Sequence, residues 1–214
     1  MWIIWSSRNK YTHEEVKYQP GRSMVLVKEL IQALYIPSEA VDMKDLERVR
    51  WKLPEEGWRK INTDAAVDVN GGSSAIGLVA RDHDGGLLLA SGHKLVGVTD
   101  PYCAELLGVR EAVLLAMEKG WTRVTIESDC RTVIEEYVAT ECRSTGSPII
   151  SDIKSYLQNF QGLCVNYVRR EANEAAHSCA RESLASVSNV ISFDVFPASL
   201  IAIVQSDVNR LSNE

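Results

Sequence analysis

The sequence predicts a mixed α/β domain, and two patterns in the order of its residues support this prediction. Residues 58–96 read as three short strands that alternate apolar and polar side chains, which is typical of an antiparallel meander. Residues 101–185 instead alternate helical and strand-like segments, which implies parallel strands joined by right-handed crossovers. The predicted element order is therefore βββαβααβα.

The first strand begins near Trp58, where the apolar spacing changes to a period of two. Successive side chains of a strand point to opposite faces, so Asp64 shares a face with Asn62, and Thr63 lies on the other face. The next two apolar segments flank the turn signal at residues 83–86, which predicts a hairpin.

The clearest helix signals follow the meander. Asp100 suits the N-cap, Pro101 suits the first helical position and Gly120 suits the end of the helix. Residues 123–129 then read as a buried strand, and the stretch from Cys130 to about Cys142 reads as a helix. Three more elements complete the domain: a helix from Pro148 to about Phe160, a strand over 163–170 and a helix over 173–185.

Different patterns precede and follow this domain. Residues 1–18 and roughly 21–36 have helix-compatible apolar spacing, so residues 1–57 are predicted to form an N-terminal helical extension and linker. We place the boundary near Gly57, because the preceding stretch is charged and contains several turn-forming residues. Residues 188–214 are predicted to be a C-terminal tail.

Composition narrows the function classes. The chain has a net charge of −6, and residues 58–187 hold 13 Lys and Arg against 17 Asp and Glu, a net of −4. This is the wrong sign for holding nucleic acid by bulk electrostatics, so a polyanionic substrate would require bridging cations.

The five cysteines are odd in number and lack zinc-site spacing, so they read as free thiols in a reducing compartment. The apolar stretch over residues 184–204 is broken by polar residues and proline, and no membrane span is expected. We expect an intracellular protein, nuclear or cytoplasmic, that is monomeric.

Three carboxylates have placements that bring them to one region. Asp64 lies within the first strand, Glu105 in the first turns of the long helix, and Asp129 at the carboxyl end of the fourth strand. Ligand sites of parallel sheets lie at that end of the strands. Converging carboxylates repel one another unless cations are bound, and Mg²⁺ prefers oxygen ligands. Taken singly, each residue also suits a structural role, as a hydrogen-bonding group, a helix-dipole partner or a cap; the joint placement favours a metal site.

Five segments that include these residues resemble the ribonuclease H type 1 superfamily. They read, in chain order, INTDAA, AIGLVARDHDG, AELLGVREAV, VTIESDC and VRREANEAAH. The resemblance covers about residues 58–187 and is strongest to the plant reverse-transcriptase-like subgroup derived from non-LTR retroelements. The leading stretch IIWSSRNKYTHE is similar to the segment that precedes this domain in retroelement polyproteins.

The resemblance implies a ribonuclease H-like fold, in which a five-stranded mixed sheet is flanked by helices. It also implies an endonuclease that cuts the RNA strand of RNA/DNA hybrids with two Mg²⁺ ions, for which Mn²⁺ can substitute, and leaves 5′-phosphates. Asp64, Glu105 and Asp129 match the metal-binding and catalytic acids of that family. Three residues are implied to contact nucleic acid: Ser128, Arg170 and Asn173. By itself, Asn173 also suits a helix cap, and Arg170 a solvated strand end.

The chain departs from the family pattern at the fourth acidic position, where His177 stands. Imidazole is a poor Mg²⁺ ligand but shuttles protons near neutral pH, so we hypothesise that His177 assists water activation or product release. Alternatively, His177 is a surface residue of a domain that has lost catalysis. Glu174, nearly one helical turn earlier, stays a candidate substitute for the missing acid.

Two other function classes compete with the nuclease prediction. One is a catalytically silent domain that binds nucleic acid or protein through the same fold, which His177 favours and the three acids disfavour. The other is a 3′ to 5′ exonuclease of the four-acid kind; those enzymes carry Asp-x-Glu on the first strand, whereas this chain has Ala66 two residues after Asp64.

Overall fold

The computed structural model describes residues 50–139, 144–188, 190–192 and 196–211. These residues belong to one compact unit, which spans Val49–Glu214. The helices predicted over residues 1–18 and 21–36 lie outside the described residues.

A six-stranded sheet forms the centre of the unit, in the order β5-β4-β1-β2-β3-β6. Strands β1, β2, β3 and β6 pair antiparallel, and β1, β4 and β5 pair parallel. Their bounds are Arg59–Asp68 for β1, Ser73–Arg81 for β2, Leu87–Leu95 for β3, Arg123–Ser128 for β4, Gly162–Tyr167 for β5 and Val190–Ser192 for β6. The predicted mixed sheet of meander and crossovers is confirmed for its five long strands.

Strand β6 lies in the segment after residue 187 that the sequence predicts to be a C-terminal tail. It pairs with β3 at the edge of the sheet, where Ser192 lies opposite Ser91. A three-residue strand is too short to show a period of two, so its pairing has no local signature.

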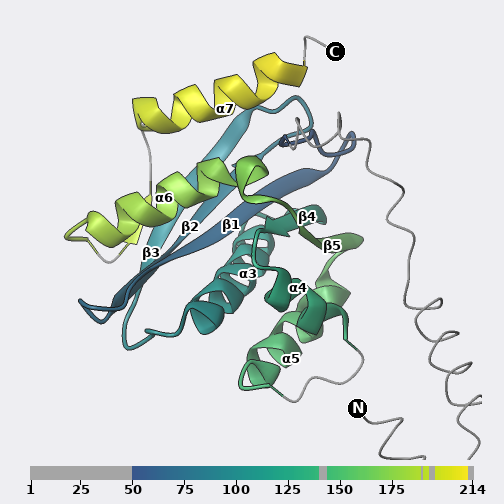
Figure 1. Cartoon of the computed structure of the whole chain (residues 1–214). Coiled ribbons are helices and arrows are strands. Elements are labelled where there is room, and N and C mark those ends of the chain that lie inside the picture. Colours follow the sequence, from purple (N-terminus) through teal and green to yellow (C-terminus); the bar gives the residue numbers. More distant parts are fainter. Residues whose placement is uncertain (1–49, 140–143, 189, 193–195, 212–214) are drawn as a thin grey trace, which may run out of the picture. The chain divides into compact units, whose positions relative to one another are not determined.

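Helices cover both faces of the sheet (Figure 1). On one face lie α3, α4 and α5, and on the other lie α6 and α7. Their bounds are Pro101–Glu118 for α3, Arg131–Val138 for α4, Ser147–Tyr156 for α5, Glu174–Ala185 for α6 and Ala198–Leu211 for α7. Short 3-10 turns stand at Leu157–Asn159 and Arg170–Ala172.

Helix α3 begins as its sequence signals predict. The Asp100 carboxylate accepts a hydrogen bond from the Cys103 amide at 3.1 Å, and Gly120 ends the segment with a φ of 66°.

Glycine also lets both covering helices approach the sheet. A β-carbon at Gly108 of α3 would lie 2.6 Å from the Thr63 hydroxyl, and one at Gly77 would collide with the Ala180 backbone of α6.

The domain begins earlier than the predicted boundary near Gly57, because the preceding segment is packed onto the sheet. Trp51 is fully buried, and its indole N–H donates to the Asn62 side chain at 2.9 Å. The Lys60 amine also donates to the Lys52 carbonyl at 2.7 Å. Residues 50–57 are therefore part of the domain rather than a linker.

The C-terminal segment is likewise integrated. Leu200 and Val204 of α7 are buried in one apolar cluster with Val79 of β2. Asp207 pairs with the fully buried Arg81 at 2.7 Å. Among the described residues, none of the helices has the length and apolar character needed to cross a membrane.

Candidate metal centre

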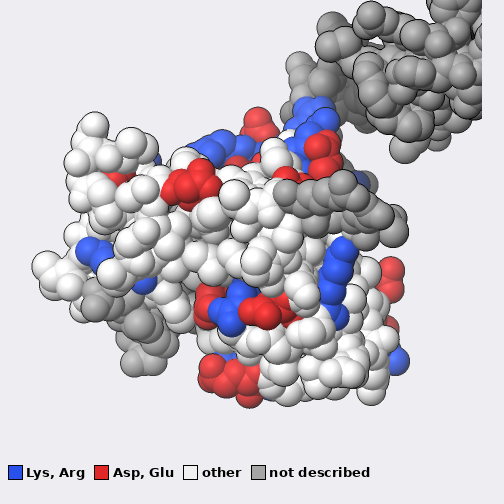
Figure 2. Space-filling model, turned by 90° about the horizontal axis from the view of Figure 1, so that it is seen from below, with Lys and Arg blue, Asp and Glu red and all other residues white. Residues whose placement is uncertain are grey.

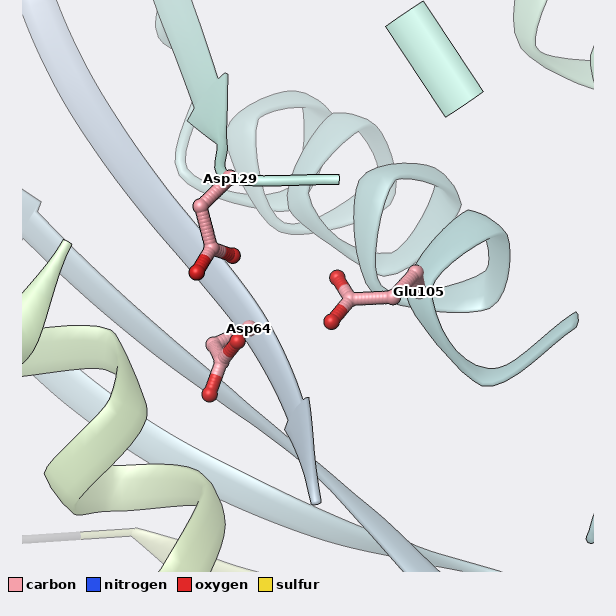
Figure 3. A group of neighbouring side chains, drawn as sticks. All are labelled: Asp64, Glu105 and Asp129. Carbon is pink, nitrogen blue, oxygen red and sulfur yellow. The ribbon is translucent and has the colours of Figure 1, made fainter. Parts of the chain in front are cut away.

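Three carboxylates meet where β1, β4 and α3 come together (Figure 3). In the parallel pairing of β1 and β4, Thr63 lies opposite Ser128, so the residues that follow them, Asp64 and Asp129, are neighbours. Glu105 reaches the same point from the beginning of α3. One oxygen of each of the three carboxylates lies within 4.8 Å of the others, so the structure brings together the three acids that the sequence predicts to converge.

Burial and mutual repulsion make this cluster electrostatically unfavourable without a cation. Burial, followed by the Asp129 charge, raises the pKa of Asp64 to about 6, although a hydrogen bond from His177 opposes the shift. Burial, followed by the charges of Asp64 and Asp129, raises the pKa of Glu105 to about 9. A bound divalent cation would favour the charged form of all three groups. Because the donor set consists of carboxylate oxygens, it fits a hard cation such as Mg²⁺ or Mn²⁺.

Buried hydrogen bonds hold the carboxylates in place. The Ala65 amide donates to Glu105 Oε1 at 3.2 Å, and the Ser128 hydroxyl donates to Glu105 Oε2 at 3.4 Å. The Asn173 amide group donates to Asp129 Oδ1 at 3.3 Å and to the Thr63 carbonyl at 2.9 Å. Such outer contacts orient metal ligands.

Ser128 and Asn173, two of the predicted nucleic-acid contacts, lie inside the protein, and their contact with nucleic acid stays a prediction. Both residues are fully buried, and their polar atoms bond within the protein. Asn173 occupies the N-cap position of α6, as its residue type favours, but its side chain makes no capping hydrogen bond, because it turns toward Asp129 and Thr63 instead. Arg170 is the exposed member of the predicted set, with a side chain 56% accessible, and its nucleic-acid contact stays a prediction.

His177 faces the cluster from α6. Its Nδ1 lies 2.7 Å from Asp64 Oδ2, and the Arg170 guanidinium lies 2.8 Å from its Nε2. The same Arg170 nitrogen lies 3.1 Å from Nδ1, so the guanidinium contacts both ring nitrogens of His177. Arg170 also faces Asp129 at 3.6 Å. The alternative acid, Glu174, is exposed and does not belong to the carboxylate cluster found among the described residues.

The cluster opens into a hollow of about 500 Å³. Its far wall holds a hydrogen-bonded group that the sequence prediction missed: the hydroxyls of Tyr102 and Ser144 both contact Glu136 Oε2. These residues come from α3, α4 and the loop before α5, and no short motif links them. The one available signal was the position of Tyr102, one helical turn before Glu105 on α3.

Charge on the surface agrees with the acidic composition. Figure 2 shows the face formed by α3, α4 and α5, on which acidic and basic side chains lie next to one another without a continuous basic tract among the described residues. Bulk attraction for a polyanion is therefore weak on this face.

A mixed sheet of this order, with helices on both faces and three carboxylates converging from β1, α3 and the end of β4, defines a ribonuclease H-like domain. The sequence pattern of the reverse transcriptase-like family matches residues 62–183, more than half of the chain, and the chain belongs to that family.

Known proteins agree with this assignment. A protein of Arabidopsis thaliana, provisionally named a ribonuclease H protein, is 29% identical over 162 residues, which are 74% of this chain and 26% of that protein. The chain thus corresponds to about a quarter of the length of this relative.

Solved structures show the same fold. Ribonuclease H1 of the halophilic archaeon Halobacterium salinarum superposes with a TM-score of 0.56 at 22% identity, over 60% of this chain and 98% of that one. The N-terminal ribonuclease H domain of a Mycobacterium tuberculosis protein gives 0.54 at 19% identity, over 60% and 94%. LC11 ribonuclease H1, solved in complex with an RNA/DNA hybrid, gives 0.53 at 22% identity, over 59% and 96%.

Proposed function

We propose that this domain is a metal-dependent endonuclease that hydrolyses the RNA strand of RNA/DNA hybrids with two divalent ions, Mg²⁺ or Mn²⁺. The observation that carries the proposal is the convergence of buried Asp64 with the partly buried Glu105 and Asp129, three acids whose mutual repulsion a cation would relieve, in a ribonuclease H-like fold. The name of the Arabidopsis relative and the hybrid bound to LC11 ribonuclease H1 support the substrate class.

The residues divide the work by position. Asp64, Glu105 and Asp129 would hold the ions, while Asn173 and Ser128 keep the carboxylates oriented. Bound divalent ions supply Lewis-acid stabilisation and a nucleophilic water at neutral pH. Hydrolysis breaks the bond between phosphorus and the 3′ oxygen, so the products are a 5′-phosphate and a 3′-hydroxyl.

His177 would act as a proton carrier beside Asp64. Its Nδ1 lies 2.7 Å from Asp64, and the Arg170 guanidinium lies 2.8 Å from its Nε2. Arg170 would turn to a substrate phosphate, which would leave Nε2 available for a proton from water or for returning one to the leaving group. With an imidazole at the position of the fourth acid, one ion would be held more weakly.

His177 is tested by two substitutions. In His177→Ala we expect turnover to fall by about 10²-fold, the usual contribution of a general acid or base. In His177→Asp we expect tighter Mg²⁺ binding by calorimetry, because the site gains a carboxylate. Wild-type turnover in His177→Ala would reject the proton-carrier role.

The nuclease itself is tested with a labelled RNA/DNA hybrid in Mg²⁺ or Mn²⁺, with wild type beside Asp64→Asn. We expect metal-dependent cutting of the RNA strand that is lost in the variant, and no cutting of duplex DNA or duplex RNA. A folded wild type that leaves the hybrid intact in both metals would reject the proposal.

A second candidate is a catalytically silent nucleic-acid-binding domain, which the imidazole at the fourth acidic position favours. It predicts hybrid binding without cutting in the same experiment. For either candidate we propose an intracellular location, nuclear or cytoplasmic, and a monomer.

A further inference from the structure

A second hollow, of about 550 Å³, lies on the other side of the chain segment that carries Arg170. Its floor is the face of β4 and β5 opposite α3, since Thr125, Glu127 and Asn166 line it while the alternating residues Ile126 and Val165 belong to the α3-side core. Helix α6 packs on β1, β2 and β3, and neither α6 nor α7 packs extensively on β4 or β5 within the described part of the chain. Residues 50–55 and the loop over 168–172 form the walls.

Arg169 and Arg170 form the ridge between the two hollows. Arg170 lines the hollow at the metal centre, and Arg169 lines the second one. Arg169 has extended backbone angles, φ −76° and ψ 157°, so the two consecutive side chains diverge. A chain of phosphates that crosses this ridge would pass one arginine and then the other.

The second hollow is basic in an acidic domain. Four Lys and Arg residues and two Asp and Glu residues line it. At its floor Lys60 and Glu127, both buried, neutralise each other in an ion pair of 2.5 Å. The side chains of Lys52 and Arg169 are exposed, and neither has a hydrogen-bond or ion-pair partner among the described residues. Their two charges are therefore available to a ligand.

Tyr167, at the end of β5, also lines the second hollow. Tyr167 is 39% exposed, and the Arg131 guanidinium lies 5.0 Å from the centre of its ring. Cations that track a backbone, combined with an exposed aromatic ring on which a base or sugar can stack, are the features that bind nucleic-acid strands. An acidic peptide would use the cations but would have no use for the ring.

We propose that this second hollow is a backbone subsite of the nucleic-acid substrate, in which Lys52 and Arg169 hold phosphates of a strand that has crossed the ridge from the metal centre. The subsite rests on the proposed function for its ligand, but its affinity is measurable without catalysis. Although the domain has a net negative charge, Lys52 and Arg169 would supply positive charge locally, within this subsite.

The test is hybrid binding, measured by fluorescence anisotropy in EDTA and low salt, where no hydrolysis occurs. Lys52→Gln and Arg169→Gln should each weaken binding by about three- to tenfold, and each should reduce the slope of log K against log salt by about 1. The matched control is Arg123→Gln, which removes an exposed arginine at the opposite end of β4 and should change neither quantity. Urea unfolding of all three variants should equal wild type.

Hybrid length provides a second readout. A hybrid shortened until it covers the metal centre alone should bind wild type and Arg169→Gln equally, while Arg170→Gln should still weaken its binding. If Lys52→Gln and Arg169→Gln bind long hybrids as Arg123→Gln does, the subsite is rejected.

The outcomes separate this inference from the proposed nuclease. Wild type that cuts hybrid while Arg169→Gln binds normally rejects the subsite and leaves the nuclease. Wild type that binds hybrid through Arg169 but never cuts it rejects the nuclease and leaves the subsite. Wild type that does not bind hybrid in EDTA and low salt rejects the subsite, and the cleavage assay in Mg²⁺ or Mn²⁺ then decides the nuclease separately.

Discussion

Two buried clusters of charge lie close together in this domain, and they are balanced in opposite ways. In the first, Arg81 pairs with Asp207 at 2.7 Å, lies 3.7 Å from the centre of the Trp51 ring and contacts Asn62 at 3.4 Å. The second is the metal centre. There three acids share one space, and the nearest cation is the half-exposed Arg170, 3.6 Å from Asp129.

The charges of Arg81 and Asp207 stabilise the fold, whereas the charges of the three carboxylates form a site for a cation. Burial lowers the pKa of Arg81, but Asp207 opposes the shift and keeps the pair ionised. No partner of that kind compensates Glu105, whose pKa rises to about 9. The clusters meet at Asn62, whose amide donates to Glu127 at 3.0 Å and to Asn173 at 3.2 Å. A rigid, balanced cluster therefore holds in place the asparagine that orients Asp129.

The largest expected effect comes from unbalancing the first cluster. Asp207→Ala leaves the buried Arg81 guanidinium without its anion, which should cost about 3–5 kcal/mol of unfolding free energy. Urea denaturation measures the loss. Asp207→Asn, which keeps one hydrogen-bond acceptor, should lose less. A loss below about 1 kcal/mol for Asp207→Ala would mean that α7 contributes little through this pair.

The second cluster should respond to pH in the absence of metal. The pKa of Asp64 is raised from 3.8 to about 6, so the neutral form is favoured in the folded protein. The contribution of Asp64 to the unfolding free energy is fully present below about pH 4. It is lost as the pH rises through 6, and the loss amounts to about 3 kcal/mol. The Glu105 carboxyl extends the decline toward pH 9.

The measurement is unfolding free energy against pH in EDTA, for wild type and Asp64→Asn. Three charged or titratable groups face Asp64 and remain in the variant: Glu105, Asp129 and His177. The difference between the two curves therefore reports the titration of Asp64 together with its effect on Glu105. We expect wild type to lose stability relative to Asp64→Asn between about pH 4 and pH 7. If wild type instead gained unfolding free energy relative to Asp64→Asn over that range, the charge of Asp64 would not be destabilising in the absence of metal.

A bound cation should neutralise the three carboxylates of the metal centre, so that both clusters are then balanced in charge. Mg²⁺ at about one hundred times its dissociation constant should raise the unfolding free energy of wild type by about 2.7 kcal/mol. At a fixed Mg²⁺ concentration the gain should shrink as the pH falls through about 9 and again through about 6, because Glu105 and then Asp64 must release protons to bind metal. Asp64→Asn, or wild type in NaCl of equal ionic strength, should show no such gain. Equal stabilisation of wild type and Asp64→Asn would place the metal elsewhere.

The two clusters also differ in how well they could be predicted from the sequence. The metal centre was predictable because its parts have local signals: Asp64 interrupts an apolar strand, Glu105 follows a capped helix start, and Asp129 follows a buried strand. Parallel strands put their carboxyl ends at one edge, so convergence followed from the order of elements.

The balanced cluster had no such signal. Arg81 and Asp207 are 126 residues apart, and each alone reads as a surface charge. The integration of residues 50–57 and of α7 depends on such distant pairs, which explains why both were predicted to lie outside the domain. The hydrogen bonds from Asn173 to Asp129 and Thr63 were not predicted, because residue type does not reveal which polar groups a fold seals from solvent.

The smallest expected change in unfolding free energy comes from breaking an ion pair at the surface, which can be compared with the buried pair of Arg81 and Asp207. Arg110 of α3 pairs with Asp152 of α5 at 3.2 Å, but the two side chains are 28% and 53% accessible. Water already solvates both charges, so Asp152→Ala should change the unfolding free energy by no more than about 0.5 kcal/mol. Added salt should reduce even this difference, whereas the Asp207→Ala loss should persist in salt because the Arg81 pair is buried. A salt-resistant loss in Asp152→Ala comparable to that of Asp207→Ala would show that position in the fold, rather than burial of the charge, decides what an ion pair contributes here.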